Sequence, residues 1–427
     1  MLTAIRSVAS LLLGAAILVL GNGLLFILLP IRLGVEGISS EASGLVMSAY
    51  YAGFVGGALR SRELIGRVGH IRAFAAFAAV LCAVTLVYAL WFGPISWTIL
   101  RAVNGFCMAG LFATIESWLN ERSSNATRGQ ILSLYMVTTY SASGTGQLLV
   151  NLSDVQSLTL YCVAALLLSI SLVPVVLTRV AGPDLSGIAP LKLRELYRIS
   201  PLGVVGCFGA GLLSGSFYGM GPIYAQAEKL SVFQVSLFMG AAIFGGLLLQ
   251  WPIGRLSDRF DRRTVLLGVL IATTLVFTVN YSLSISGAAE LTSLWLLLGL
   301  PALFGGGMAV IYPIAVAHAF DYVAKERMVA ASSGLLLAWA IGATTGPLVA
   351  SLLMGRLGAP VLLVYLAIIA GALALFVHYR MTRRAALPAR EQAAFVPVTT
   401  TSAVAGKLDP RAGDSAAPAT EQAAAAS

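Results

Sequence analysis

The chain consists of long apolar runs separated by short segments rich in charged and turn-forming residues. The runs lack the strict alternation of a membrane β-strand, and each is near the ~20 residues with which an α-helix crosses a bilayer. Because backbone amides in lipid must hydrogen-bond within their own segment, the runs are predicted to be helices. The predicted spans cover residues 10–30, 44–62, 73–92, 96–118, 131–151, 157–178, 202–225, 232–253, 264–285, 293–317, 329–352 and 359–379.

Composition places these helices in a membrane. The chain is 58% hydrophobic and only 11% charged, whereas soluble domains carry roughly 25% charged residues. The first run is longer than the apolar core of a signal peptide and many similar runs follow it, so we expect a retained helix. The four Cys residues lie inside apolar runs, which favours small buried side chains over a disulfide framework.

Basic residues indicate which side of the membrane each segment faces. Of the 27 Lys and Arg residues, Arg101 lies within a span, and Arg32, Lys229 and Arg356 fall on one side. All the others fall on the opposite side, which by the positive-inside rule is the cytoplasm. We therefore expect a multi-pass protein with cytoplasmic N- and C-termini. The net charge of +9 then reflects topology and contact with anionic lipid, not nucleic-acid binding.

The longest link between spans divides the chain. It contains Pro183, Gly187 and Pro190, and predicts two six-helix bundles at residues 1–180 and 201–380, joined by a cytoplasmic central loop at 181–200. Residues 381–427 are rich in Ala, Thr, Ser and Pro and poor in large apolar side chains, a composition typical of disorder. We expect a disordered cytoplasmic tail there.

A charged turn follows the second span of each predicted half. In the second half it holds Asp258, Arg259 and Asp261, followed by a pair of Arg residues, and a turn at residues 62–72 takes the corresponding place in the first. This repetition indicates a duplication. Because only the second turn has an acidic residue at the position of Asp258, we predict an inner gate there, with Arg259 beside it. The alternative is a surface charge of little energetic weight.

These features resemble the major facilitator superfamily of secondary transporters over roughly residues 8–380. The turn from Gly254 to Arg263 is similar to the family's first motif, and Arg101, Asn104 and Gly105 are similar to its span-four motif. A further set of residues resembles the YcaD-type branch of bacterial transporters. That set is Glu116, Ser117, Arg128, Gly129, Tyr135, Met136, Gly146, Gln147, Leu148, Leu149, Tyr312, Pro313, Leu335, Leu336, Gly346 and Pro347.

The resemblance implies the fold class and the location. The fold is an all-α integral membrane protein, with twelve transmembrane helices in two pseudo-symmetric six-helix bundles, and the membrane is the bacterial inner (plasma) membrane. Two positions depart from the family pattern: Asp261 stands where the first motif usually has Gly, and Thr145 replaces the Pro of the family's span-five antiporter motif.

Polar side chains inside apolar spans are the candidate substrate and coupling residues. A charge such as Arg101 at a helix centre costs ~2.5 to 3.5 kcal/mol, so it faces a cavity or a partner unless it snorkels to the interface. With the family's helix arrangement, Asn22, Asn104 and Gln147 form one polar cluster with Arg101; the alternative is ordinary interhelical hydrogen bonding. The aromatic candidates, for which packing is the alternative, are Tyr218 and Tyr312.

Two titratable residues fall at corresponding positions of the halves, near the inner ends of their spans. They are Glu116 and His318. A buried carboxyl group and a buried imidazole have pKa values shifted toward neutrality, which predicts proton carriers. The alternative for Glu116 is an intracellular latch, in which it pairs with one of the Arg residues of the neighbouring inner loops.

The function expected is secondary active transport by alternating access. The sequence contains no phosphate-binding Gly-Lys-Ser/Thr loop and no metal-ligand spacing, so we expect no enzyme, no ATP-driven pump and no cofactor. The expected partners are a neutral or amphipathic small-molecule substrate, membrane lipid and protons as the coupling ion, with no nucleic acid; we expect a monomer and an exporter. The alternatives are a proton-coupled metabolite importer and a membrane receptor or scaffold that moves no solute.

Overall fold

The computed structural model describes residues 2–124, 127–177, 191–286, 293–324, 327–385, 387, 392 and 395–409. Its elements are all helices. In chain order they are α1 (Leu2–Val35), α2 (Ser40–Val68), α3 (His70–Leu90), α4 (Pro94–Glu121), α5 (Arg128–Leu148), η1 (Leu149–Leu152), α6 (Leu158–Ile170), α7 (Leu172–Val176), α8 (Leu193–Ile199), α9 (Pro201–Ala227), α10 (Val232–Arg259), α11 (Arg262–Ser286), α12 (Leu294–Phe320), α13 (Met328–Leu357), α14 (Val361–Arg383) and η4 (Ala403–Leu408).

The long helices of the described residues form twelve membrane spans. Within the described residues, eleven helical segments are long and apolar enough to cross a bilayer, with α6 and α7 together forming one of them. The twelfth span is α5, which has the same length as α3 and packs against α1 and α10. It is less apolar than the others because one of its faces carries polar side chains that line a central cavity, among them Thr139, Ser143 and Gln147.

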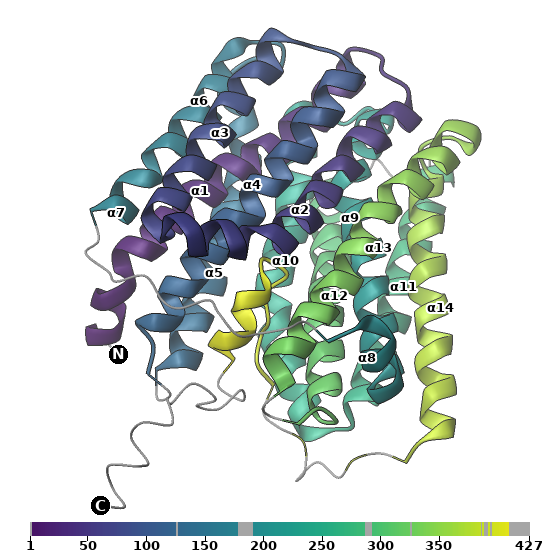
Figure 1. Cartoon of the computed structure of the whole chain (residues 1–427). Helices are drawn as coiled ribbons and strands as arrows, with labels where there is room; N and C mark the ends of the chain where they lie inside the picture. The colour runs from purple at the N-terminus through teal and green to yellow at the C-terminus, as the bar shows by residue number, and fades with distance from the viewer. Residues whose placement is uncertain are drawn as a thin grey trace, which may run out of the picture.

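The spans form two bundles of matching design (Figure 1). In the first half, α1 packs on α5 and α6, and α2 packs on α4; in the second, α9 packs on α13, and α10 packs on α12. The pairs correspond, because α9 and α13 are the first and fifth spans of the second half. The predicted fold class, two pseudo-symmetric six-helix bundles in an all-α membrane protein, is confirmed.

Backbone contacts at glycine hold equivalent helix pairs together in both halves. A Cβ atom on Gly105 of α4 would lie 1.9 Å from the backbone oxygen of Tyr50 on α2. A Cβ atom on Gly305 of α12 would lie 2.2 Å from the backbone oxygen of Ala242 on α10. Lipid is as apolar as the helices, so burial of apolar side chains drives their association little and close van der Waals contact takes its place.

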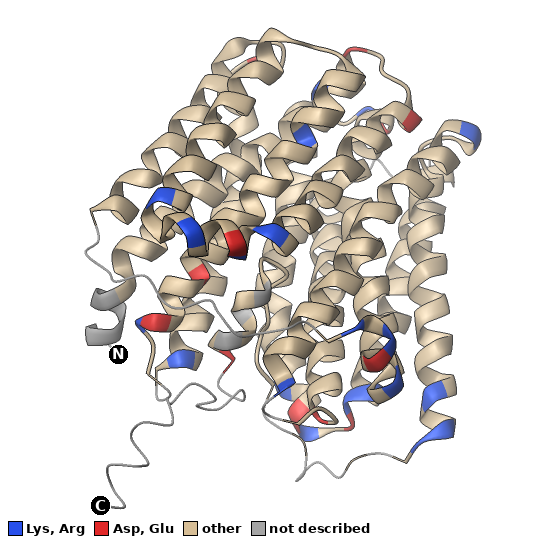
Figure 2. Cartoon of the chain, viewed as in Figure 1, with Lys and Arg blue, Asp and Glu red and all other residues tan. Residues whose placement is uncertain are grey.

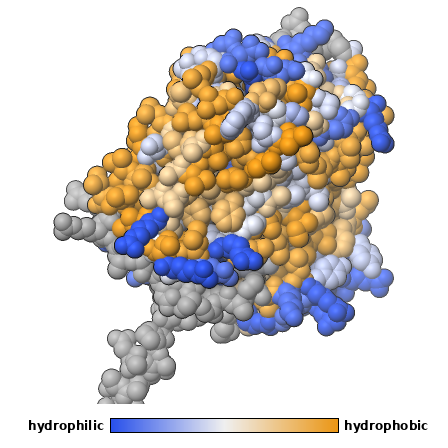
Figure 3. Space-filling model, turned by 45° about the horizontal axis from the view of Figure 1, so that its top comes forward, coloured by the Kyte–Doolittle hydropathy of each residue, from blue (hydrophilic) through white to orange (hydrophobic). Residues whose placement is uncertain are grey.

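The bundle has two polar ends and an apolar girdle. We call the end where α2, α4, α10, α12 and α14 finish the tail side, and the opposite end the far side. Lys and Arg residues gather around the helix ends of the tail side (Figure 2), and a broad band of hydrophobic residues lies between hydrophilic patches (Figure 3). Large apolar side chains such as Leu248 and Leu375 are more than 70% exposed in this girdle, at 71% and 73%. It is the surface that lipid covers.

Two segments differ from their sequence-based predictions. The central loop contains the short helix α8, which packs against α9 and α13; residues 181–190 lie outside the described part. The tail was predicted to be disordered over residues 381–427, and this is wrong for residues 395–409. That segment, which we call the tail segment, packs against α4, α5 and α13 through η4. It buries apolar side chains such as Val404 and Leu408, while residues 410–427 lie outside the described part.

The glycine contacts generate a stability prediction. Replacing Gly305 with Ala forces the backbones of α10 and α12 apart, and overpacking of this kind costs about 1 to 3 kcal/mol. Gly299 lies on the same helix, but no atom lies within 4 Å of the place that its Cβ atom would take, so Gly299→Ala should be neutral or stabilising. We expect the thermal unfolding temperature of the detergent-purified protein to fall for Gly305→Ala only. Equal temperatures for the two variants would contradict the backbone contact.

Candidate functional site

A central cavity of about 250 Å³ lies between the two bundles. Helices α1, α2, α4 and α5 of the first half and α9, α10, α12 and α13 of the second contribute to its wall. The tail segment contributes the residues Val398 to Thr401. A cavity at the interface of two helix repeats is where secondary transporters bind their substrates.

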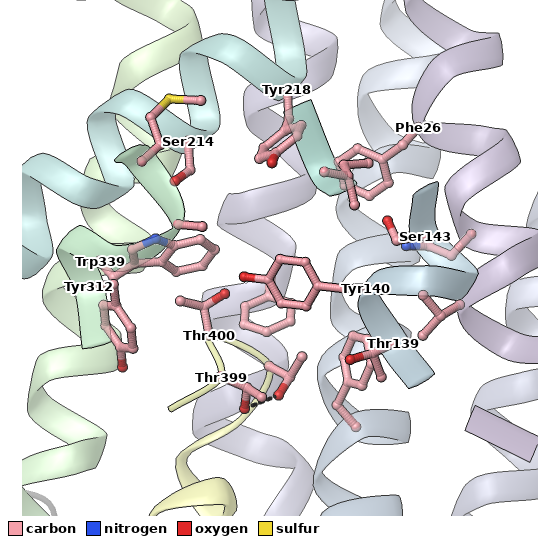
Figure 4. A pocket seen from close by; sticks show the side chains of 18 of the residues that line it. Phe26, Thr139, Tyr140, Ser143, Ser214, Tyr218, Tyr312, Trp339, Thr399 and Thr400 are labelled. Carbon is pink, nitrogen blue, oxygen red and sulfur yellow. Dashed lines mark hydrogen bonds between the residues drawn. The ribbon is translucent and has the colours of Figure 1, made fainter. Parts of the chain in front are cut away.

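Nine aromatic side chains of the described residues line the cavity, several of which are labelled in Figure 4. Trp339 of α13 contacts Tyr51 of α2 across the two halves, with ring centroids 5.9 Å apart and an edge-to-face angle of 81°. It also lies 6.4 Å from the ring of Tyr312. Tyr140 and Tyr218 enter from α5 and α9. Such a wall offers flat apolar faces to a ligand together with phenol hydroxyls that can hydrogen-bond to it.

Amide and hydroxyl groups supply the polar part of the wall. The side chain of Gln147 donates from Nε2 to the backbone oxygen of Gly23 at 3.2 Å. Its Oε1 atom and the Oδ1 atom of Asn22 are buried and have no hydrogen-bond partner within the described residues. Two buried acceptors next to a cavity favour a ligand with hydrogen-bond donors, because an unpaired buried polar atom is costly. No Asp, Glu, Lys or Arg is among the described residues that line the cavity.

Arg101 and Asn104 lie behind the cavity wall, between α4 and its neighbours. Arg101 is fully buried, and its guanidinium carbon lies 4.7 Å from the ring centre of Phe26 and 5.1 Å from that of Tyr50. One of its nitrogens contacts the sulfur of Met47 at 3.7 Å. The others have no hydrogen-bond partner in the described structure, and neither do the amide atoms of Asn104. The rings that cover Arg101 are cavity-lining rings, so a ligand is separated from its charge by one aromatic layer.

The predicted polar cluster is therefore divided between two layers. Asn22 and Gln147 line the cavity with the aromatic candidates Tyr218 and Tyr312, whereas Arg101 and Asn104 form the layer behind. The role of each residue stays a prediction.

Direct contacts between the halves close the far side. The side chain of Asn151 donates to the hydroxyl of Ser236 at 2.9 Å, linking η1, which follows α5, to the start of α10. Gln226 on α9 donates to the backbone oxygen of Ile31 on α1 at 3.2 Å. A Cβ atom on Gly44 of α2 would lie 2.0 Å from the hydroxyl of Ser351 on α13. These contacts join the two halves at the far side.

Glu116 lies on the tail side of the cavity and is fully buried. It accepts a hydrogen bond from the hydroxyl of Tyr135 at 3.0 Å and further hydrogen bonds from the hydroxyls of Thr401 and Ser402. The partners described are thus hydroxyl groups, two of which belong to the tail segment. Arg101 is on the same helix, but the helical rise places the two residues about 22 Å apart, so they do not form an ion pair.

The charged turn between α10 and α11 forms a network with neighbouring helices. The buried Arg262 lies 3.9 Å from Asp258 and 3.4 Å from Asp321 at the end of α12. Arg263 pairs with Asp261 at 2.7 Å. Burial raises the pKa of the Asp261 carboxyl, but the hydrogen bonds and positive charge of Arg263 outweigh it, so the pKa lies below its ordinary value. The turn therefore ties α10 and α11 to α12.

The two predicted gate residues of this turn differ in their surroundings. Asp258 accepts a hydrogen bond from the backbone N–H of Phe395 at 2.6 Å, so it contacts the tail segment. Arg259 is exposed. His318 lies in a separate small hollow beside Tyr322, with ring centroids 5.1 Å apart, and Arg263 and Arg384 also line this hollow. The structure thus places Asp258 at the boundary of the tail segment and His318 in a different site from Glu116.

Several functional candidates were not found from the sequence. They include Phe26, Tyr50, Tyr51, Phe54, Tyr140, Ser143, Ser214 and the tail residues Val398 to Thr401. A signal for the tail was present, because residues 392–406 carry no charge and contain three Val residues and a Phe. No cluster of His, Cys, Asp and Glu in the described residues is placed to hold a metal ion.

The unpaired charge of Arg101 generates a second prediction. Arg101→Met replaces a buried charge that has no described carboxylate partner with an unbranched apolar side chain. We expect the free energy of unfolding in detergent to rise by about 1 to 3 kcal/mol. The control is Arg60→Met, an exposed side chain near the end of α2, which should change little. A loss of stability in Arg101→Met would show instead that the contacts with Phe26 and Tyr50 outweigh desolvation.

Comparison with known protein families gives matches over most of the chain. The model of the Major Facilitator Superfamily matches residues 11–277 and 206–408. The chain is 30% identical over 362 residues to the uncharacterized MFS-type transporter YE1530 of Yersinia enterocolitica, which covers 82% of this chain and 90% of the relative. It is 31% identical over 360 residues to the uncharacterized MFS-type transporter YcaD of Shigella flexneri, covering 83% and 90%. The predicted resemblance is confirmed.

Solved structures share the fold at low sequence identity. The nucleoside transporter NupG superposes with a TM-score of 0.73 at 14% identity, covering 88% of this chain and 98% of NupG. A bacterial homologue of the human lysosomal transporter Spinster, in an inward-facing and unoccupied conformation, superposes with a TM-score of 0.62 at 13% identity, covering 97% and 99%. The chain therefore belongs to the major facilitator superfamily and is a multi-pass membrane transporter, not an enzyme.

Proposed function

We propose that this transporter moves an uncharged or amphipathic small molecule that has a flat apolar part and at least one hydrogen-bond donor. The observation that supports this most directly is the composition of the central cavity wall. Rings such as Trp339 and Tyr140 surround the space, and Asn22 and Gln147 present unpaired acceptors beside it. A strongly charged substrate would lose its hydration there without gaining an opposite charge.

Transport proceeds by alternating access between the tail side and the far side. The contacts of Asn151 with Ser236 and of Gln226 with Ile31 close the far side in the state described here. Rocking of one bundle against the other separates these contacts and opens the far side. The inward-facing state named for the Spinster homologue is the corresponding conformation of a related fold.

The orientation of the protein in the membrane follows from its charges, and the direction of transport follows from its cavity. We assign the tail side to the cytoplasm of the bacterial inner membrane, because the Lys and Arg residues gather there. Substrate then enters from the cytoplasm and leaves at the far side, which is export. A metabolite importer would use the same cavity in the reverse direction, and the transport assay below distinguishes the two.

Proton coupling is the energy source we propose. Glu116 is a fully buried carboxyl group in a spanning helix, and ionisable groups at membrane depth commonly mark proton or ion pathways. One proton that crosses 100 mV supplies about 2.3 kcal/mol. The charge of Arg101 lies behind the rings of Phe26 and Tyr50, and from there it favours the binding of electron-rich groups in the cavity.

Purified protein in liposomes tests this function. Uncharged aromatic compounds that raise its thermal unfolding temperature should also dissipate an imposed pH gradient, as reported by a pH-sensitive dye. Trp339→Ala removes a cavity ring. It should raise at least tenfold the compound concentration that gives half-maximal dissipation of the pH gradient. Trp251→Ala removes an exposed ring that stacks on Arg255 and should change it little. If no compound class alters the gradient while the protein remains folded, proton-coupled transport is excluded.

A reversible cross-link tests alternating access separately. Asn151→Cys with Ser236→Cys, in a background lacking the four native Cys residues, places two thiols where side chains already meet. Oxidation should hold the far side closed and reduce transport to the level of empty liposomes, and a reductant should restore it. Ser153→Cys with Ser236→Cys serves as the oxidation control. Transport that continues at full rate in the cross-linked protein would contradict movement of this contact.

A further inference from the structure

The tail segment occupies the space between the bundles on the tail side. Figure 1 shows η4, in yellow, between the helices of the two halves, and η4 packs against α4 of the first and α13 of the second. Val396, Val398, Val404 and Leu408 are each at most 6% exposed. The three Val residues lie in a stretch that has no charge from residue 392 to 406, and Leu408 follows it. Together these side chains bury enough surface to offset part of the entropy lost on ordering.

Hydrogen bonds attach the tail segment to both halves. On the first half, Thr401 and Ser402 donate to the carboxylate of Glu116. On the second half, Asp258 accepts from the backbone N–H of Phe395. A carboxylate acceptor makes a hydrogen bond stronger than a neutral one. The two carboxylates that the sequence predicts as inner-gate or proton residues are thus bound by the tail segment.

The tail segment also forms part of the substrate cavity. Val398, Thr399, Thr400 and Thr401 line it together with side chains from both bundles. In Figure 4, Thr400 extends from the tail segment toward Tyr140 and Trp339, and Thr399 lies next to it on the side away from these rings. A molecule that approaches the cavity from the tail side therefore meets the tail segment before it meets the aromatic wall.

We propose that the tail segment is an autoinhibitory plug of this transporter. This proposal rests on the proposed function, because a transporter must close the tail side to open the far side. A segment bound between α4 and α13 prevents that closure and blocks entry from the tail side at the same time. The plug therefore leaves its site before each transport cycle begins, and its hydrogen bonds to Glu116 and Asp258 set how readily it leaves.

Access to the cavity tests the plug without any need for transport. In the full-length chain, with Cys82, Cys107, Cys162 and Cys207 replaced by Ala, Ser143→Cys places one thiol in the cavity wall. A charged methanethiosulfonate reagent is added to the detergent-purified protein. The double substitution Thr401→Ala and Ser402→Ala should accelerate modification at least tenfold. The matched control is Ser133→Ala, an exposed hydroxyl on α5 that bonds within its own helix. Equal rates in the tail variant and the control would overturn the proposal.

A cross-link tests the position of the segment should the tail variant fail to fold. A Cβ atom on Gly406 would lie 2.8 Å from the Cβ atom of Ser332 on α13, about 1 Å closer than the two Cβ atoms of a disulfide, so a small outward shift of the tail segment brings the pair to bonding distance. With a protease site inserted after Leu387, oxidised Gly406→Cys with Ser332→Cys should retain the tail fragment after cleavage. Gly406→Cys with Ser351→Cys, roughly 28 Å further along α13, should release it. Release from both pairs would overturn the proposal.

Transport measurements separate the plug from the function on which it rests. Faster cavity modification together with a severalfold higher transport rate in the Thr401→Ala, Ser402→Ala variant supports both. Faster modification and a retained cross-link, with no transport by any variant, support the plug and refute the proposed function. Measurable transport at an unchanged rate, despite faster modification, refutes autoinhibition.

Discussion

The absence of hydrogen-bond partners in lipid is the constraint on which the rest of this structure depends. It makes every span a helix and directs polar side chains toward the molecule's interior. The polar face of α5, with Thr139, Ser143 and Gln147, follows from it, because these groups face the cavity. The same constraint places the charge of Arg101 inside the bundle, against the rings of Phe26 and Tyr50 and the sulfur of Met47. Cavity and candidate site are thus the place where this apolar chain can keep polar groups.

Within that constraint, glycine determines which helices meet and how closely. At Gly105 and Gly305 the backbones of paired helices touch, and the two contacts occupy equivalent places in the two halves. Contacts of this kind depend on shape and less on buried side-chain area, so they hold the paired helices of each bundle firmly together. A rigid half that moves against another is what alternating access requires.

The sequence predicts the architecture well because the signals for it are long and repeated. Twenty-residue apolar runs and the asymmetry of Lys and Arg are averaged over many positions. The site is harder to predict because a membrane helix is apolar on its lipid face and its packed face alike. Tyr51 and Trp339 therefore look in the sequence like any other packed or interfacial aromatic, and only the structure brings their rings together.

The tail segment was predicted wrongly for a different reason. Taken as a whole, residues 381–427 have a composition typical of disorder, and this average conceals a short uncharged run with Phe395 and three Val residues. The run is buried because the two halves offer it apolar walls and two carboxylates, Glu116 and Asp258. The composition of a segment indicates how much apolar surface it can bury by itself. Here the surface against which the segment is buried belongs to other parts of the chain.

A covalent connection also changes how strongly the tail segment must bind. Residues 384–394 join it to α14, and a short tether of this kind holds a ligand at an effective concentration in the millimolar range. Even weak contacts then keep the tail side of the cavity occupied when substrate is scarce on that side of the membrane. Substrate, in turn, competes with a ligand that never diffuses away. If the tail segment is a plug, the substrate concentration at which transport begins therefore depends on the length of the tether as much as on the cavity itself.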